Sequence, residues 1–144
     1  RRSSDLRPGK LTGKWFRSTT WVDDARTPVL YVYFYPDGGF LYQIAYADGA
    51  TGAWRIEGDT VILWSPDFSI VLDSVLLPYG PRRWPNLNKY TDATDDNRDR
   101  YLVRGNKLYP IMKDGINELP LVKISKKQAK IELQDYPFYY NVKD

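Results

Sequence analysis

The sequence contains no cysteine and no histidine, and these two absences remove most of the side chains on which enzymes and metal sites depend. Without cysteine there is no disulfide framework, no thiol nucleophile and no thiolate ligand. Without histidine the usual general base and the commonest zinc ligand are missing. The sequence therefore excludes hydrolytic triads and zinc sites, and we expect a protein that is not an enzyme and that uses neither a metal nor a cofactor.

Long apolar runs and concentrated charge are also missing. A helix that crosses a bilayer needs about 20 apolar residues, and the longest apolar stretch here, residues 69–77, is interrupted by Asp73 and Ser74. The 21 basic and 18 acidic side chains are scattered along the chain and give a net charge of +3. We therefore expect no transmembrane segment and no nucleic-acid partner.

Aromatic residues, in contrast, are abundant, with 12 tyrosines and 5 tryptophans among 144 residues. Aromatic side chains favour strands, and a chain of this length has the usual size of one domain. Residues 1–14 are rich in serine, proline and glycine without periodicity. The sequence predicts a flexible tether over residues 1–14 and a single β domain over residues 15–144.

Turn signals divide that domain into short segments of strand-like composition. Asp-Gly, Gly-Asp and Pro-Asp pairs separate about nine such segments, a pattern typical of small all-β proteins. We predict an all-β fold, a small antiparallel meander β-barrel of about eight or nine strands, with a β-sandwich as the alternative. Ser125 is placed to cap a short C-terminal helix over residues 126–134, which we expect to pack outside the barrel. The predicted strands are residues 15–21, 29–35, 40–47, 52–56, 60–65, 68–77, 101–104, 107–112 and 119–124.

The hairpin around the turn Pro36-Asp37-Gly38-Gly39 is the most informative segment. A four-residue turn places Tyr35 opposite Phe40 and Tyr33 opposite Tyr42, on the same face as Tyr31. The other face of the hairpin is also largely apolar, so we expect both faces to be covered. One would line the barrel interior and the other would lie beneath the C-terminal segment or a partner.

Two segments of the chain resemble a known family. Leu11-Thr12-Gly13-Lys14-Trp15 is similar to the first strand of lipocalin-like (calycin-type) domains, whose Gly-x-Trp motif places the tryptophan at the bottom of the barrel. The succession of strand, Asp-Gly turn, strand, Gly-x-Trp at residues 52–54 and Gly-Asp turn at residues 58–59 resembles bacterial lipocalin-like envelope proteins.

This likeness spans residues 11–65 and implies a β-barrel that acts by binding. It also implies a periplasmic, envelope-associated or secreted protein, with a lipid anchor of a lipoprotein outside the present sequence as one option. The chain starts with Arg1 rather than methionine, as either a processed or a trimmed chain would.

Aromatic side chains of the hairpin and the following strands form the candidate ligand site. Barrels of eight or more strands can leave room for a small apolar or aromatic ligand. The same side chains can instead fill the interior, and the sequence leaves both alternatives open. The candidate ligand-binding residues are Tyr31, Tyr33, Tyr42, Tyr46, Trp54 and Trp64.

A loop over residues 78–98 combines cations with aromatic side chains and is a candidate docking surface. Such a combination could bind a phosphate, an acidic glycan or, by stacking, a nucleic-acid base, although only three cations gather here and Trp84 could instead cap one end of the barrel. The candidate partner-binding residues are Arg82, Arg83, Trp84 and Tyr90.

Two acidic features offer alternatives that we weigh against structural roles. Asp73 lies in an apolar segment and could act as a catalytic carboxylate, or be neutralised by an arginine such as Arg55. The four aspartates at positions 92, 95, 96 and 99 could bind calcium, but Asn97 stands where an EF-hand loop needs glycine, which favours a solvated loop.

Together these features predict a non-catalytic, lipocalin-like binding protein that holds a small hydrophobic or aromatic ligand in its barrel. The alternative is a ligand-free protein–protein interaction module of the cell envelope. It would dock through the 78–98 loop or through the outer face of the sheet.

Overall fold

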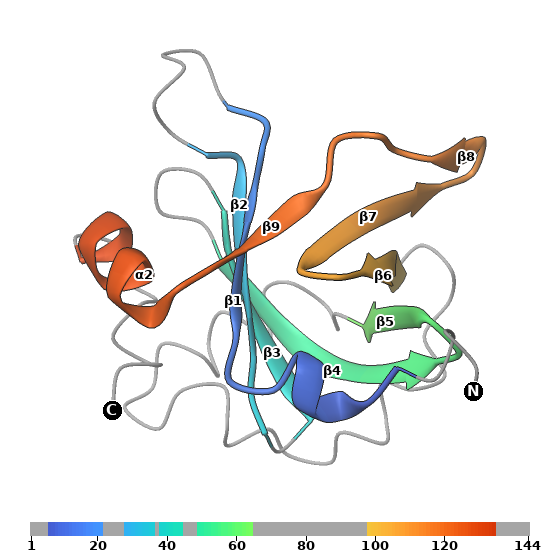
Figure 1. Cartoon of the computed structure of the whole chain (residues 1–144), viewed down its shortest axis with the longest axis horizontal. Helices are drawn as coiled ribbons and strands as arrows, with labels where there is room; N and C mark the ends of the chain where they lie inside the picture. Colours follow the sequence, from blue (N-terminus) through green and yellow to red (C-terminus); the bar gives the residue numbers. More distant parts are fainter. Residues whose placement is uncertain (1–5, 22–27, 37, 45–48, 65–97, 135–144) are drawn as a thin grey trace.

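The computed structural model describes residues 6–21, 28–36, 38–44, 49–64 and 98–134. Nine strands and one short helix account for most of these residues (Figure 1). The strands are β1 (Trp15–Ser18), β2 (Leu30–Phe34), β3 (Gly39–Ile44), β4 (Gly49–Glu57), β5 (Thr60–Trp64), β6 (Arg98–Arg104), β7 (Lys107–Met112), β8 (Gly115–Ile116) and β9 (Leu121–Ile124). The helices are η1 (Pro8–Lys10), a single 3₁₀ turn, and α2 (Lys126–Leu133).

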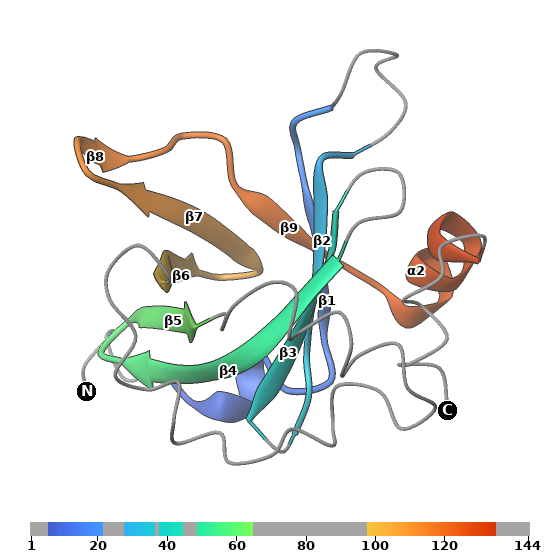
Figure 2. The same ribbon diagram turned by 180° about the vertical axis from the view of Figure 1, so that it is seen from behind.

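Eight of these strands close into an antiparallel barrel. The neighbours follow the order β6-β5-β4-β3-β2-β1-β9-β7, and a further pairing of β6 with β7 completes the ring. Strand β8 adds to β7 alone, at Ile111 and Met112. Both views show β4 as a long curved strand that turns the sheet from β3 toward β5 (Figures 1 and 2). The prediction of an all-β antiparallel barrel with a short C-terminal helix is confirmed.

The barrel interior is filled by apolar side chains from alternate positions of its strands. Strand side chains point alternately to the two faces of a sheet, so adjacent residues such as Trp15 and Phe16 separate to opposite sides. The Phe34 ring meets Phe16 and Trp54 edge-on, with ring centroids 5.8 and 5.2 Å away. The buried interior residues are Leu11, Phe16, Val32, Phe34, Phe40, Tyr42, Val61, Leu63, Tyr101, Leu108 and Leu121.

A second apolar layer lies outside the barrel, between strands β1 to β3 and helix α2. The Trp15 and Tyr33 rings pack at a tilt with centroids 5.0 Å apart, and Tyr35 meets Tyr33 edge-on. Ala129 and Leu133, one helical turn apart, cover this layer from α2. Trp15 therefore lies under the helix, whereas the family resemblance implied a place at the bottom of the barrel, and Phe16 takes the interior position.

Polar contacts fix α2 in this place. The Ser125 hydroxyl accepts a hydrogen bond from the Gln128 backbone at 3.0 Å, which confirms the predicted helix cap. On the barrel side Glu132 forms an ion pair with Arg17 and accepts a hydrogen bond from the Tyr31 hydroxyl at 2.6 Å. Gln128 donates to the same carboxylate at 2.6 Å. A charged network thus joins the helix to β1 and β2.

The predicted register of the first hairpin is wrong by one residue. The structure pairs Phe34 with Phe40 and Tyr33 with Leu41, because Gly39 belongs to β3 and the loop holds three residues, 36–38. The Tyr35 nitrogen donates to the Gly39 carbonyl, and Gly38 adopts a positive φ of 95°, as a glycine does at the end of a three-residue hairpin loop. A shift of one residue moves β3 to the opposite face, so Tyr42 points inward while Tyr31 and Tyr33 point outward.

The N-terminal segment packs against the barrel from residue 6 onward. Leu11, with 0% of its surface exposed, belongs to the interior cluster. The Gly13 nitrogen donates to the Phe34 carbonyl at 2.8 Å, which ties the segment to the end of β2. Residues 6–14 therefore close one end of the barrel, where we had expected a tether, and residues 1–5 lie outside the described part.

Most predicted strands appear with shifted ends, and residues 107–112 form β7 as predicted. The predicted strand over residues 68–77 and the loop over residues 78–97 lie outside the described residues. Strand β8 was not predicted, because two residues are too few for a periodic pattern. Among the described helices, none is long and apolar enough to cross a membrane.

Candidate functional site

A cleft opens where strands β6 and β7 separate. Their pairing runs from Arg104 and Lys107 as far as Tyr101 and Pro110. Proline has no backbone N–H to donate, so it ends a hydrogen-bonded ladder. Beyond this point residues 98–100 continue beside β5, and Ile111 and Met112 pair with β8. The two strands thereby leave a solvent-open cleft of about 350 Å³ at the end of the barrel away from η1.

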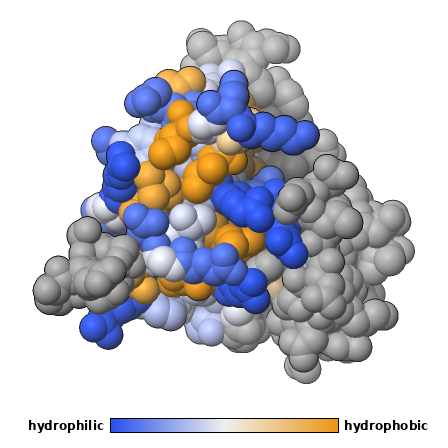
Figure 3. Space-filling view, turned by 90° about the vertical axis from the view of Figure 1, so that its right-hand side faces the viewer, coloured by the Kyte–Doolittle hydropathy of each residue, from blue (hydrophilic) through white to orange (hydrophobic). Residues whose placement is uncertain are grey.

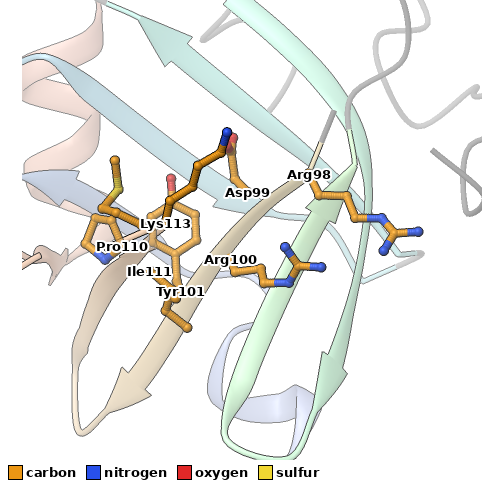
Figure 4. Close-up of a pocket in the computed structure, with 8 residues that line it drawn as sticks. Arg98, Asp99, Arg100, Tyr101, Pro110, Ile111 and Lys113 are labelled. Atoms are coloured by element: carbon orange, nitrogen blue, oxygen red, sulfur yellow. The ribbon is translucent and has the colours of Figure 1, made fainter. Parts of the chain in front are cut away.

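Residues 98–101 and 110–113 line this cleft, and they provide two kinds of surface. Pro110, Ile111 and Met112 supply an apolar wall. The β6 side carries polar groups, and Figure 4 shows the side chains of Arg98 and Arg100 directed away from those of Asp99 and Tyr101. Asp99, Tyr101 and Lys113 therefore form the polar end of the cleft.

A chain of hydrogen bonds lies at that polar end. The Tyr42 hydroxyl is 2.9 Å from the Asp99 Oδ2 atom and 2.9 Å from the Tyr101 hydroxyl. A carboxylate only accepts hydrogen bonds, so the single proton of Tyr42 goes to Asp99. The Tyr101 hydroxyl must then donate to the Tyr42 oxygen. The direction of the whole chain follows from the carboxylate at its end.

Burial raises the pKa of both tyrosines. The pKa of Tyr42 lies well above its ordinary value of 10.0, first because burial disfavours a phenolate and second because Tyr101 and Asp99 are close. Burial and the Asp99 charge also raise the pKa of Tyr101. Both phenols are therefore neutral at physiological pH, and neither provides a nucleophile or a general base there.

The described lining of the cleft contains one acidic side chain, that of Asp99. Among the described residues, no group of three acidic side chains is arranged to hold a metal ion. Asp99 lies within β6 and is bonded to Tyr42, so it belongs to a strand and not to the acidic loop in which we had considered calcium. The other three aspartates of that candidate and Asp73 lie outside the described residues.

The structure separates the predicted ligand-binding residues. Tyr42 and Trp54 face the interior, where Tyr42 joins the hydrogen-bonded chain and the Trp54 indole donates to the Tyr35 carbonyl at 3.2 Å. Tyr31 and Tyr33 lie on the outer side beneath α2 and do not reach the interior. Trp64 ends β5, and Tyr46 lies outside the described residues.

The four predicted partner-binding residues, Arg82, Arg83, Trp84 and Tyr90, also lie outside the described residues. Sequence reasoning missed the cleft itself, although two signals were present. Asp99 and Tyr101 are two positions apart, so they share one face of a strand. Pro110 stands in the middle of a strand-like segment, where it marks the end of a hydrogen-bonded ladder.

Fold and cleft together define an eight-stranded antiparallel β-barrel whose architecture is compatible with ligand binding. No known protein family matches the sequence, and no curated protein matches it either. Among solved structures the chain is similar to an uncharacterized protein from Bacteroides eggerthii, with 12% sequence identity and a TM-score of 0.43. The alignment covers 79% of this chain and 99% of that protein.

Proposed function

We propose that the protein is a non-catalytic, lipocalin-like binding protein that takes a small apolar or aromatic ligand in the cleft between β6 and β7. The observation that carries the proposal is the combination in one cleft of an apolar wall at residues 110–112 with the polar group of Asp99 and Tyr101. Ligand sites typically pair a mostly apolar lining with a few placed polar groups. Because apolar side chains fill the barrel interior, this cleft is a better ligand site than the barrel lumen.

The resemblance to envelope lipocalin-like proteins supports, as part of the same proposal, a periplasmic or secreted location. In such a location a small carrier would exchange its ligand directly with the surrounding medium. The solvent-open cleft suits such exchange, since no lid has to move among the residues that line it.

The first experiment is native mass spectrometry of the protein purified from its own host, followed by organic extraction and mass analysis. A stoichiometric small molecule supports the proposal. Titration with an apolar fluorescent probe then locates the site through two matched variants, since Met112 is 53% exposed in the cleft and Ile131 is 55% exposed on α2.

We expect Met112→Gln to weaken probe binding roughly five- to tenfold, because it removes apolar contact from the wall. Ile131→Gln should leave the probe affinity unchanged. A protein that carries no bound molecule and has no affinity for apolar probes would overturn the proposal.

A second candidate function is a protein–protein interaction module. Exposed apolar side chains gather near β8, where Met112 (53%), Ile116 (45%) and Leu119 (54%) lie within eight positions of the chain. Figure 3 views the face that looks outward on the β8 side of Figure 1, and it displays apolar patches bordered by hydrophilic side chains. Exposed apolar patches of this kind often mark protein contacts. Loss of a co-purifying partner in the Ile116→Gln and Leu119→Gln variants, with probe affinity intact, would favour this candidate.

A further inference from the structure

The hydrogen-bonded chain at the polar end of the cleft has consequences for the kind of ligand that fits. It rests on three groups, the Asp99 carboxylate and the hydroxyls of Tyr42 and Tyr101. Since Tyr42 donates to Asp99 and Tyr101 donates to Tyr42, both tyrosine protons are already used. Tyr101 then keeps an oxygen lone pair and Asp99 keeps its other carboxylate oxygen, and both residues line the cleft.

Both groups that remain are acceptors. Within the part of the chain that the structure describes, the Asp99 Oδ1 atom and the free lone pair of Tyr101 have no other partner. Tyr101 is only 5% exposed and lines the cleft. A ligand group that can only accept hydrogen bonds finds no partner on these two oxygens. It would depend on the exposed Lys113 ammonium, which water already solvates, so that exchange gains little.

The cations near the cleft restrict the charge of the ligand. Arg98, Arg100 and Lys113 all line it, together with the carboxylate of Asp99. At the polar end, the Lys113 ammonium disfavours a second cation beside Tyr101, and the Asp99 carboxylate disfavours an anion there. The two arginine side chains, however, point away from Tyr101, so they do not offer an anion a direct contact at that end (Figure 4).

We propose that the cleft selects neutral apolar or aromatic molecules that carry a hydroxyl or N–H group, which donates to the Tyr101 oxygen and to Asp99. This inference rests on the proposed binding function and names the ligand class for the same cleft. The apolar body of the ligand lies on Pro110, Ile111 and Met112, and its donor group lies at the β6 side.

Three probes of similar size and different hydrogen-bonding capacity test the inference. Naphthol donates a hydrogen bond, methoxynaphthalene only accepts one, and naphthoate carries a negative charge. We expect the wild-type protein to bind naphthol about tenfold more tightly than methoxynaphthalene. Only naphthol can donate a hydrogen bond to Asp99 and Tyr101, and one such bond corresponds to about a tenfold change in affinity. Isothermal titration calorimetry measures all three affinities.

Variants of the acceptor groups provide the second half of the test. In Tyr101→Phe the preference for naphthol should fall to near one, while the affinity for methoxynaphthalene stays the same. Tyr109→Phe is the matched control, because Tyr109 lies on neighbouring β7 and does not line the cleft. Asp99→Asn replaces an acceptor by an amide at an exposed position and should reduce the preference even if Tyr101→Phe proves unstable.

The outcomes separate the two proposals. Equal affinity for naphthol and methoxynaphthalene would overturn the inference while leaving the binding function in place. Stronger binding of naphthoate than of naphthol would also overturn it, since the cations would then dominate recognition. Failure of all three probes to bind would count against the binding function itself.

Discussion

The hydroxyl oxygens of Tyr42 and Tyr101 lie 2.9 Å apart, although 59 positions separate the two residues in the chain. They come from β3 and β6, two strands that are not neighbours in the barrel. Their contact therefore crosses the interior and links opposite walls. Because Tyr42 also donates to Asp99, the contact connects the apolar core to the cleft.

Removal of the Tyr42 hydroxyl should destabilise the fold measurably. In Tyr42→Phe both Asp99 and Tyr101 lose their partner, so we expect the free energy of unfolding to fall by about 1–3 kcal/mol. Urea denaturation followed by tyrosine and tryptophan fluorescence measures the change. Tyr109→Phe, at a half-buried position on β7, is the control and should change stability by less than about 0.5 kcal/mol. Equal effects of the two substitutions would contradict the hydrogen-bonded chain.

The same tyrosines predict a loss of stability in alkali. Their pKa values are raised in the folded protein, first of all by burial, relative to the ordinary value of 10.0 in the unfolded chain. Above about pH 10 the unfolded state therefore binds fewer protons than the folded state, so the free energy of unfolding falls as pH rises. Below pH 10 this contribution is fully present.

Denaturation midpoints measured at intervals from neutral to strongly alkaline pH test this dependence. In the folded protein, phenolate absorbance should report at least two tyrosines that titrate only as the barrel unfolds. A full complement of tyrosines titrating normally in a folded barrel would rule out the predicted burial effect.

For Glu132 we predict the opposite effect, a loss of stability at acid pH. Burial alone would raise its pKa, but the hydrogen bonds from Tyr31, Gln128 and Arg17 outweigh burial and lower it below 4.5. The folded state thus stabilises the carboxylate, a contribution that is present above pH 4.5 and lost as pH falls through the folded pKa. We expect Glu132→Gln to cost about 1 kcal/mol at neutral pH and little in acid.

The ion pair of Arg55 and Glu57 provides the control for this prediction. Both side chains are 53% exposed, and exposed pairs contribute little to stability. Glu57→Gln should therefore leave the unfolding midpoint within error at either pH. A wild-type-like midpoint for Glu132→Gln at neutral pH would mean that α2 is held by its apolar contacts alone.

Leu11 tests whether the N-terminal segment belongs to the core. Because its side chain is fully buried against the barrel interior, Leu11→Ala should lower the free energy of unfolding by about 2–4 kcal/mol. Lys10→Ala, at the exposed neighbouring position, should have almost no effect. Chemical denaturation of the two variants compares them directly. Equal stabilities would support the prediction from composition that residues 1–14 form a flexible tether.

Much of the fold could be predicted from the sequence, because turn chemistry is local. Asp-Gly and Gly-Asn pairs separate the strands wherever they occur. Ser125 marks the start of α2, and its hydroxyl accepts a hydrogen bond from Gln128 three residues later. The first hairpin shows the limit of this reasoning. Pro36-Asp37-Gly38-Gly39 fits a loop of three or of four residues. In the structure the loop is the shorter one, and Gly39 belongs to β3, where it pairs with Ala53 of β4.

The uncertain length of this loop accounts for the wrong grouping of Tyr31, Tyr33 and Tyr42 in the predicted ligand site. With β3 shifted by one position, Tyr42 joins Tyr101 inside the barrel, and Tyr31 and Tyr33 join Trp15 beneath α2. The cleft forms where β6 and β7 separate, which depends on the pairing of their far ends with β5 and β8. The two signals of it were the shared strand face of Asp99 and Tyr101 and the place of Pro110 within a strand-like segment.

The pairing of β1 with β9 also governs the order in which this protein takes shape during synthesis. Trp15 lies opposite Ile124, so β1 completes its pairing only after residue 124 has been synthesised. Until then β1 has β2 as its sole neighbour, and Arg17 has yet to meet Glu132. Contacts that join such distant positions make folding slow. A nascent chain in which β9 has not yet formed therefore has an open sheet with unpaired edges, and such edges are prone to aggregation.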